Sequence, residues 1–325
     1  MRASRAPVRI ISTKADVGTD AVVRALADLD VPVVRLNSED YPFEFELTID
    51  LDSVAPNHVR WGLAPPGSEI EQSRSIWYRR VRAPSKPPHM DQGTYEFCVR
   101  ESRTALMGAV LLGSHRIMSD PTRVSAAENK PYQLHLAKTV GLSIPSTLVT
   151  NSPAAVREAY HRFGGRMIVK PAKSGYVELE GEGHAIYTSQ VLAQHLEEID
   201  SARWSAAIYQ PLLEKACDVR VTVVGDRVLT AEIDSQVDPE ARVDWRHTVD
   251  PNLPHRKGQL PASVEAAVRD LVRRLGLAFG AIDFIRTPAD EYVFLEINPN
   301  GQWLWLDDKV QLGITQSIAS WLAQE

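Results

Sequence analysis

The alternation of apolar and polar positions at the start of the chain predicts an α/β unit. VRIIS (8–12) and VPVVRL (31–36) are apolar runs of strand length, and the segment between them carries apolar side chains at helical spacing. Strand, helix and strand in this order predict a β-α-β unit. Further strands are expected at 43–50, 58–63, 75–81 and 116–121, with one long helix at 91–112. Residues 1 to about 120 are therefore expected to form one α/β unit.

From residue 122 onward the pattern predicts shorter helices mixed with strand pairs. A helix ends at Gly141, and Gly225-Asp226 predicts the turn of a hairpin. Other helices are expected at 152–164, 189–198, 263–276 and 309–323. Strands are expected at 143–150, 166–171, 206–213, 217–225, 228–234, 278–287 and 291–298. The glycine-rich stretch between 173 and 187 predicts a flexible segment between strands.

Composition narrows the class of protein. The chain has 325 residues, of which 44% are hydrophobic and 24% are charged, as in ordinary globular proteins. Its formal net charge of −6 disfavours nucleic-acid binding. No apolar run approaches the ~20 residues that span a bilayer. Cys98 and Cys217 lie far apart and form no disulfide or zinc pattern, so a cytoplasmic location is expected.

The segment VFLEIN (293–298) carries the first candidate chemistry. Alternation along a strand places Glu296 and Asn298 on one face, about 7 Å apart, with Val293, Leu295 and Ile297 on the other. Two oxygen-bearing side chains on one face suit a hard cation such as Mg²⁺. The pair alone is also compatible with a solvated strand end.

Further charged and polar residues, in a fixed order along the chain, make a nucleotide–metal site the preferred interpretation. Lys130 begins a helix and Lys170 ends a strand, and two lysines can bind phosphate oxygens. Asp218 and Arg220 share one strand face, and Arg220 would stabilise charge on a transferred phosphoryl group. Asp283 would complete the metal ligands with Glu296 and Asn298. The candidate adenine contacts are Gln210, Pro211, Leu212 and Leu213.

These stretches resemble the ATP-grasp ribosomal peptide maturases, the graspetide or microviridin-type macrocyclases. The resemblance rests on IWYRRV, NKPYQL, GLSIPSTLVTNSP, IVKP, QPLLEKACDVRVTVVG, VDWRH, AIDF and LEINPNGQWLWLD. No P-loop pattern GxxxxGK[ST] occurs. The segment 173–187 departs from a compact glycine loop, so its phosphate contacts stay open. The nucleotide core is shared with ribosomal-protein glutamate ligases, whereas WYRR, DWR and NGQWLWL favour the maturases.

The resemblance implies an ATP-grasp fold of the α/β class, in which two α+β subdomains clamp ATP. It implies an N-terminal pre-ATP-grasp domain (1–120), a central subdomain (121–205) and a C-terminal subdomain with the metal site (206–325). ATP and Mg²⁺ would activate an Asp or Glu of a ribosomal precursor peptide, with leader and core, as an acyl phosphate. A Ser, Thr or Lys side chain would then close an ω-ester or ω-amide ring. A homodimer is also implied.

Four accessory residues have two interpretations each. Arg246 would hold the peptide carboxylate or the acyl phosphate, or else stack on Trp245. Arg79 and Arg80 end a strand and could bind a substrate carboxylate, or form surface ion pairs. Glu214 could contact the ribose hydroxyls, or be a charge at a strand end.

Other functions remain open from the sequence. An ATP-grasp ligase could form amide bonds on a free amino acid, a small peptide or a protein C-terminus. A kinase could use the same clamp to phosphorylate a stable acceptor. A nucleotide-binding scaffold without turnover is disfavoured, because Lys130, Lys170, Arg220 and the three expected metal ligands are all present.

Overall fold

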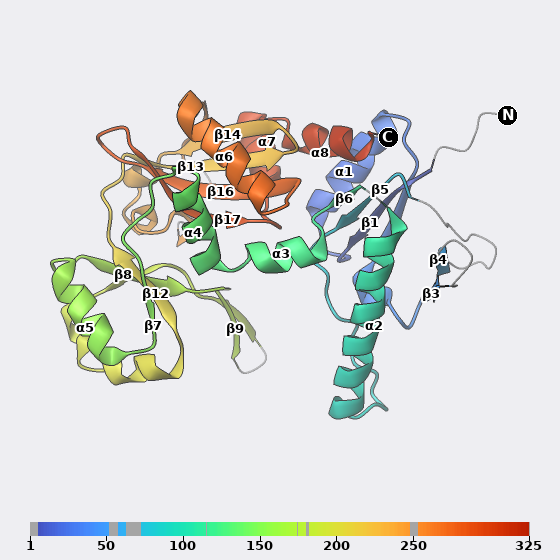
Figure 1. Cartoon of the computed structure of the whole chain (residues 1–325), viewed down its shortest axis with the longest axis horizontal. Coiled ribbons are helices and arrows are strands. Elements are labelled where there is room, and N and C mark those ends of the chain that lie inside the picture. The colour runs from blue at the N-terminus through green and yellow to red at the C-terminus, as the bar shows by residue number, and fades with distance from the viewer. Residues whose placement is uncertain are drawn as a thin grey trace.

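The N-terminal unit is built on a parallel sheet. The computed structural model describes residues 6–51, 58–62, 73–114, 116–173, 175–179, 182–247 and 253–324. The sheet has the order β2-β1-β5-β6, and Figure 1 shows α1 and α2 packed beside it. Its elements are β1 (Val8–Ser12), α1 (Val17–Asp28), β2 (Val33–Asn37), β5 (Ser75–Tyr78), α2 (Gln92–Gly113) and β6 (Ile117–Met118). A separate antiparallel pair consists of β3 (Glu46–Asp50) and β4 (His58–Gly62). Asp16 and Asp91 cap the two helices by accepting bonds from backbone N–H groups.

The central unit is an antiparallel sheet covered by one helix. Its order is β11-β8-β12-β7, and Val156 and Ala159 of the helix pack on Met167 and Tyr209 of the sheet. The elements are β7 (Leu148–Thr150), α5 (Pro153–Arg162), β8 (Met167–Pro171), β11 (Ser189–Val191) and β12 (Ala207–Pro211). The hairpin β9 (Tyr176–Leu179) and β10 (Glu182–Ala185) projects from this sheet on the same side of the molecule as α2 (Figure 1).

The C-terminal unit is a five-stranded antiparallel sheet in the order β15-β14-β13-β16-β17. Its strands are β13 (Cys217–Val224), β14 (Arg227–Ile233), β15 (His255–Gly258), β16 (Phe279–Arg286) and β17 (Tyr292–Asn298). One face packs on α3 (Pro121–Ala127), α4 (Lys130–Thr139) and α6 (Ala262–Arg274). The other face packs on α7 (Leu304–Val310) and α8 (Ile314–Leu322). Both expected hairpins, at 225–226 and between β16 and β17, are confirmed.

The packing joins the expected units across their boundaries. The cluster that contains Leu306 and Ile318 also contains Val8 and Leu26 of the N-terminal unit. Figure 1 shows α8 beside α1 accordingly. The first two helices after residue 120 pack on the C-terminal sheet and not on the central one. The N- and C-terminal units therefore share one hydrophobic core.

One expected helix is wrong in the structure and another is confirmed only in part. The segment 189–198 is β11 followed by a short 3-10 helix (Ala193–Leu196). The expected helix 309–323 is confirmed over α8, whereas Lys309 and Val310 end α7, and the two helices are separated where Gln311 and Gly313 adopt left-handed backbone angles. Five other 3-10 turns lie at Ser38–Asp40, Ile199–Trp204, Ser235–Val237, Pro239–Ala241 and Trp245–His247. Every helix in the described ranges is too short or too polar to cross a membrane.

Candidate active site

Helix α4 places Lys130 beside β17, and Gln133 fixes that helix to the same strand. Asn129 caps the helix by accepting the N–H of Tyr132. The amide of Gln133 donates to the carbonyl of Ile297 at 2.8 Å and accepts the N–H of Ile297 at 3.0 Å. Gln133 is 2% exposed, so breaking either bond would leave a buried polar group without a partner. Lys130 and Gln133 are three residues apart and therefore face the same side of the helix.

Asp283 and Glu296 are direct partners in the β16–β17 register, as the metal hypothesis requires. A β-bulge follows them, since Phe284 pairs with Phe294 and leaves Leu295 unpaired. The expected facing of Leu295 is therefore wrong. Leu295 lines the same cavity as Glu296, whereas Phe294 and Ile297 lie in the core on the other side.

Glu296 is the counter-ion of three cations. Lys130 Nζ lies 3.1 Å from one carboxylate oxygen and Arg246 Nη1 3.6 Å from the other. Burial alone would raise the pKa of Glu296, but Lys130, Lys170 and Arg246 lower it below its usual range. Burial lowers the pKa of Lys170, and Glu296 only partly opposes this. An anionic ligand would favour the charged form of Lys170, because it would add a negative charge beside the ammonium.

Lys130 and Lys170 also hold two edges of the clamp together. Lys130 Nζ donates to the carbonyl of Pro171 at 3.2 Å, and Lys170 Nζ donates to the carbonyl of Leu295 at 3.4 Å. Lys130 therefore ties α4 to the end of β8, and Lys170 ties β8 to β17. The structure brings these residues together with Glu296, where the sequence expected a phosphate site.

Arg220 lies on β13, beside Asp283, which is one of the three expected metal ligands. It pairs with Asp283 in the register, and Arg220 Nη1 donates to the Asp283 carboxylate at 2.8 Å. Arg220 Nη2 reaches the carbonyl of Gln302 at 3.4 Å. Its Nε is buried without a partner among the described residues. The guanidinium is therefore held by Asp283 on one side and by the Gln302 carbonyl on the other.

Arg246 is held by its neighbour Asp244. Both oxygens of Asp244 accept bonds of 2.8 Å from Arg246, and one also accepts the backbone N–H of Thr188 at 3.3 Å. The Asp244 side chain is 3% exposed, and that of Arg246 is 43% exposed. Trp245 packs on Trp305, with ring centroids 5.1 Å apart. Arg246 therefore points toward Glu296 and lines the cavity. It does not stack on Trp245, whose ring packs on Trp305.

Two cavities meet at Arg246 and Glu296, and both residues line each of them. The first encloses about 690 Å³, partly open to solvent, and reaches Gln210, Pro211, Leu212 and Leu213. Its apolar walls are Pro145, Ile168, Leu213, Ile285 and Leu295. The second encloses about 900 Å³ and is lined by Lys130, Lys173, Gly175 and Asn298, among others. A chamber with one apolar wall, opening into a chamber that Lys130, Lys173 and Arg246 line, fits a base followed by phosphates.

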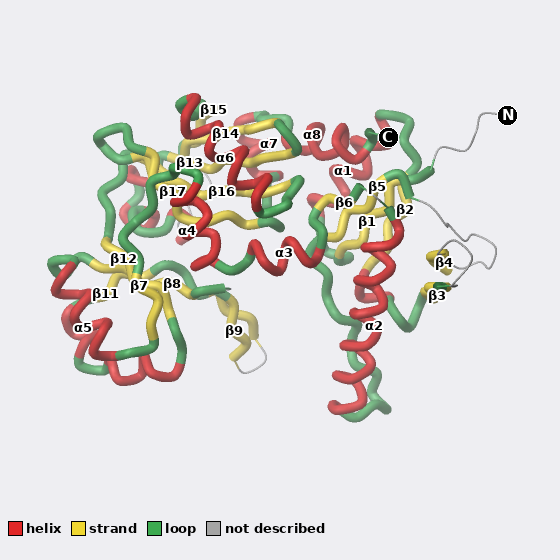
Figure 2. The backbone as a smooth tube through the Cα atoms, in the orientation of Figure 1, coloured by secondary structure: helices red, strands yellow, loops and turns green. Residues whose placement is uncertain are grey.

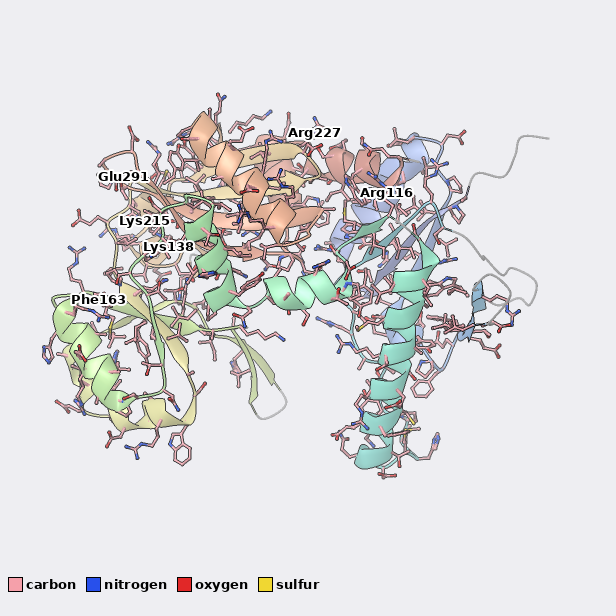
Figure 3. The ribbon with its side chains drawn as sticks, viewed as in Figure 1. Arg116, Lys138, Phe163, Lys215, Arg227 and Glu291 are labelled. Carbon is pink, nitrogen blue, oxygen red and sulfur yellow. The ribbon has the colours of Figure 1, made fainter. Side chains whose placement is uncertain are left out.

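The first cavity also contains an ion pair that the sequence analysis did not single out. Lys215 Nζ lies 2.6 Å from Asp218 and both side chains are almost fully buried. Burial raises the pKa of Asp218 although Lys215 lowers it. Glu214, the expected ribose contact, points to the surface and pairs with Arg166 at 3.2 Å. Lys215 lies where the chain passes from β12 to β13 (Figure 3). In the sequence, only its position shortly before CDVR (217–220) indicated that it could belong to the site.

Arg79 does not lie where the sequence expected it. It is 0% exposed, and its Nε donates to Asp16 at 2.8 Å. Its guanidinium also lies 4.5 Å from the ring centroid of Trp303 and 3.4 Å from the carbonyl of Gly301. A substrate contact does not fit this burial. Arg80, in contrast, is exposed with a left-handed backbone.

The donor set fits a magnesium ion. Asp283 and Glu296 supply carboxylate oxygens from paired strands, and Asn298 supplies an amide oxygen at the mouth of the second cavity. The described residues contain no group of three His, Cys, Asp or Glu side chains placed to hold a metal. A magnesium ion here would accordingly depend on few protein ligands, with phosphates and water completing its shell, as Mg²⁺ prefers. The expected phosphate segment is the β9–β10 hairpin, of which residues 174, 180 and 181 lie outside the described ranges.

Comparison with known proteins identifies the fold and the family. The crystal structure of macrocyclase MdnB from Microcystis aeruginosa MRC matches 98% of this chain and 100% of its own, with 31% identity and a TM-score of 0.79. The chain belongs to the ATP-grasp macrocyclase family. The expected family and ATP-grasp fold are thereby confirmed, and the protein is a ligase.

Further comparisons agree with this macrocyclase assignment. The pre-ATP-grasp domain model of MvdD matches residues 8–123. Macrocyclase MdnC of Microcystis aeruginosa MRC, bound with precursor peptide MdnA, is 28% identical over 97% of this chain and 98% of its own, with a TM-score of 0.85. The ATP-grasp ligase of Chryseobacterium gregarium, in complex with ADP and a leader and core peptide, is 27% identical over 98% and 96%, with a TM-score of 0.88. No curated protein matches the chain.

Proposed function

We propose that this macrocyclase uses ATP to close ω-ester or ω-amide rings in a ribosomal precursor peptide. The observation that carries the proposal is the junction, at Arg246 and Glu296, of a cavity with an apolar wall and a cavity lined by Lys130 and Lys173. One cavity suits a purine, the other suits phosphates, and Arg246 lies at the point where a peptide carboxylate would meet the terminal phosphate.

The chain's own residues would divide the work of binding between the two cavities. The 210–213 segment, with Lys215 and Asp218, would bind the nucleoside. Lys130 and Lys170 would neutralise phosphate oxygens, and their present bonds to Glu296 and Leu295 hold them ready. Magnesium, held by Asp283, Glu296 and Asn298, would neutralise phosphate charge when bound.

Two arginines would then act on the reacting groups. Arg246 would orient the carboxylate of a peptide Asp or Glu, which attacks the terminal phosphorus and releases ADP. Arg220 would stabilise the charge that develops on the transferred phosphoryl group. A hydroxyl or amine of the same peptide would attack the acyl carbon and displace phosphate, losing its proton as the ester or amide forms. Each ring therefore removes one water from the peptide.

The proposal includes the partner and setting expected from the sequence. The precursor would have a leader and a core, and the enzyme would be a cytoplasmic homodimer without nucleic-acid or membrane partners. Sedimentation of the purified enzyme at several concentrations tests the dimer. A single monomeric species at all concentrations would contradict it.

The decisive test is intact mass of a co-expressed precursor peptide, encoded beside this gene and rich in Ser, Thr or Lys with Asp or Glu. Losses of whole water masses that disappear with Glu296→Gln support ring closure. No loss, together with ADP release in the presence of free glutamate, favours the small-substrate ligase instead. Hydroxylamine gives a second check, because it traps an acyl phosphate as a hydroxamate and leaves a phosphorylated alcohol unchanged.

A further inference from the structure

A third cavity lies in the N-terminal unit, away from the nucleotide. It encloses about 320 Å³, partly open to solvent, between helix α2 and the loop that follows β5. Tyr41, Val99 and Leu106 supply apolar walls, and Ser38 and Ser102 supply hydroxyl groups. Figure 2 shows the loop between β5 and α2 descending beside that helix toward its free end.

Hydrogen bonds to the 81–84 segment shape this cavity in advance. Ser38 Oγ accepts the backbone N–H of Arg82 at 2.9 Å, and Tyr95 Oη donates to the carbonyl of Pro84 at 2.6 Å. Ser38 and Leu106 are buried. The loop is therefore fixed to both the sheet edge and the helix, and a ligand would enter a formed site.

Two cations at this cavity have no carboxylate partner. Arg82 and Arg103 both line it and both are exposed, and neither forms an ion pair with any residue that the structure describes. Arg79, on the same segment, is paired with the buried Asp16. Two free guanidiniums beside an apolar wall suit a carboxylate side chain flanked by apolar residues.

The cavity lies within peptide reach of the reacting groups. Arg79 contacts the 301–302 loop, and Arg220 contacts the carbonyl of Gln302. Only three peptide units separate Arg79 from Arg82, which is at most about 11 Å along the chain. The path from Arg82 to the phosphates also includes the side chains of Arg79 and Arg220, so an extended peptide segment of several residues is needed to place one acidic residue at the phosphates and another at Arg82.

We propose that this cavity, with Arg82 and Arg103, binds an acidic segment of the peptide substrate that is not the segment being activated. The inference rests on the proposed function, because it takes the substrate to be a peptide rich in Asp or Glu. Binding there would hold the peptide in place while the reacting carboxylate is exchanged at Arg246.

The test measures fluorescence anisotropy of a labelled peptide of alternating Glu and Val, with the enzyme saturated with a non-hydrolysable ATP analogue and Mg²⁺. Arg82→Glu/Arg103→Glu is expected to raise Kd about tenfold or more, because two attractive contacts become repulsive. The matched control is Arg157→Glu/Arg227→Glu, which changes the net charge equally at exposed sites on α5 and β14. The control is expected to bind as the wild type does.

A second pair of variants separates the cavity from general surface charge. Ser102→Trp fills the cavity without changing charge and is expected to weaken binding severalfold, whereas Ser102→Ala leaves it unchanged. Equal Kd values in all variants would overturn the inference, as would a loss on charge reversal with no effect of Ser102→Trp. Ring closure by the wild-type enzyme is scored separately, so failure of the proposed function is seen there and not in the binding data.

Discussion

Glu296 is the side chain that balances the charges of the candidate site. It is shared by Lys130 and Arg246 and lies close enough to Lys170 to influence that lysine's pKa. Glu296→Gln would keep the shape, replace one expected carboxylate ligand by a neutral amide and leave the cations without their common counter-ion. We expect ATP turnover to fall by about 100-fold or more while the fold persists.

ADP release and far-UV circular dichroism measure these two properties of Glu296→Gln. Asn298→Ala is the companion variant, because it removes the amide oxygen without disturbing the ion pairs. Full activity in both variants would contradict the assignment of the metal ligands.

Arg79 can be tested as a positioning residue. Arg79→Met leaves the buried Asp16 carboxylate without its cationic partner, although Ser12, Gly18 and Thr19 still donate hydrogen bonds to it. We expect this to cost up to about 3–5 kcal/mol of stability. Arg79→Met/Asp16→Asn removes both charges and is expected to recover most of that stability. The double variant still lacks the donor to Gly301, so we expect kcat to stay low with an unchanged KM for ATP.

Steady-state kinetics and urea unfolding of the single and double variants separate the two effects. If kcat recovers together with stability in the double variant, Arg79 serves the fold alone.

The 299–303 loop follows β17 and contacts Arg79 of the N-terminal unit. Gly301 is closely packed within this loop. An added Cβ would lie 2.4 Å from the Cβ of Ala281 and 2.9 Å from Nη2 of Arg220. Gly301→Ala must therefore displace the loop or the guanidinium. We expect ligation to fall at least about tenfold with only moderate loss of stability.

Gly93→Ala is the matched control, because its Cβ would meet only a carboxylate oxygen of Asp91 at 3.5 Å. Assays of ring closure and thermal unfolding on both variants give the comparison. Equal activity of Gly301→Ala and the wild type would show that the loop yields without moving Arg220.

Strand and helix positions could be predicted from the sequence wherever the pattern was regular. The 217–234 hairpin follows from two apolar runs around Gly225-Asp226. The bulge at Leu295 could not be predicted, because alternation assumes an unbroken register and the bulge depends on pairing with β16. The break at Gln311–Gly313 had a signal in Gly313, but the apolar spacing continued across it.

The charged residues of the candidate site could be predicted from the sequence, but the residues that hold them in place could not. Lys130 and Lys170 lie beside Glu296 as expected, and Arg220 contacts Asp283, the strand partner of Glu296. Gln133 was missed, because its role depends on a strand more than 160 residues away in the sequence.

Buried carboxylates hold separate elements of the molecule together, in addition to the shared core. Asp16 pairs with Arg79 within the N-terminal unit, Asp244 accepts a bond from Thr188 of the central unit, and Glu296 pairs with Lys130 of α4. Burial would raise the pKa of each of these three carboxylates, but their cationic and hydrogen-bonding partners lower it below the usual value. Each therefore stabilises the assembled molecule in its ionised form.

The direction of the pH dependence follows from these lowered pKa values. Near pH 4 these carboxylates are partly protonated in the unfolded chain but still ionised in the folded protein, so acid favours unfolding. The stabilisation is complete above the unfolded pKa of about 4 and is lost as pH falls through the lower folded values. Asp218, whose pKa is raised by burial, opposes this trend but is one group against three.

We therefore expect the contribution of these carboxylates to the free energy of unfolding to be nearly constant from about pH 7 to 5 and to fall steeply below about pH 4. Urea unfolding at a series of pH values measures it. Arg79→Met/Asp16→Asn should flatten the acid limb, because one of the three linked carboxylates is gone. A stability that rises on acidification would mean that the raised pKa of Asp218 dominates, and that these three carboxylates do not stabilise the folded molecule in their ionised form.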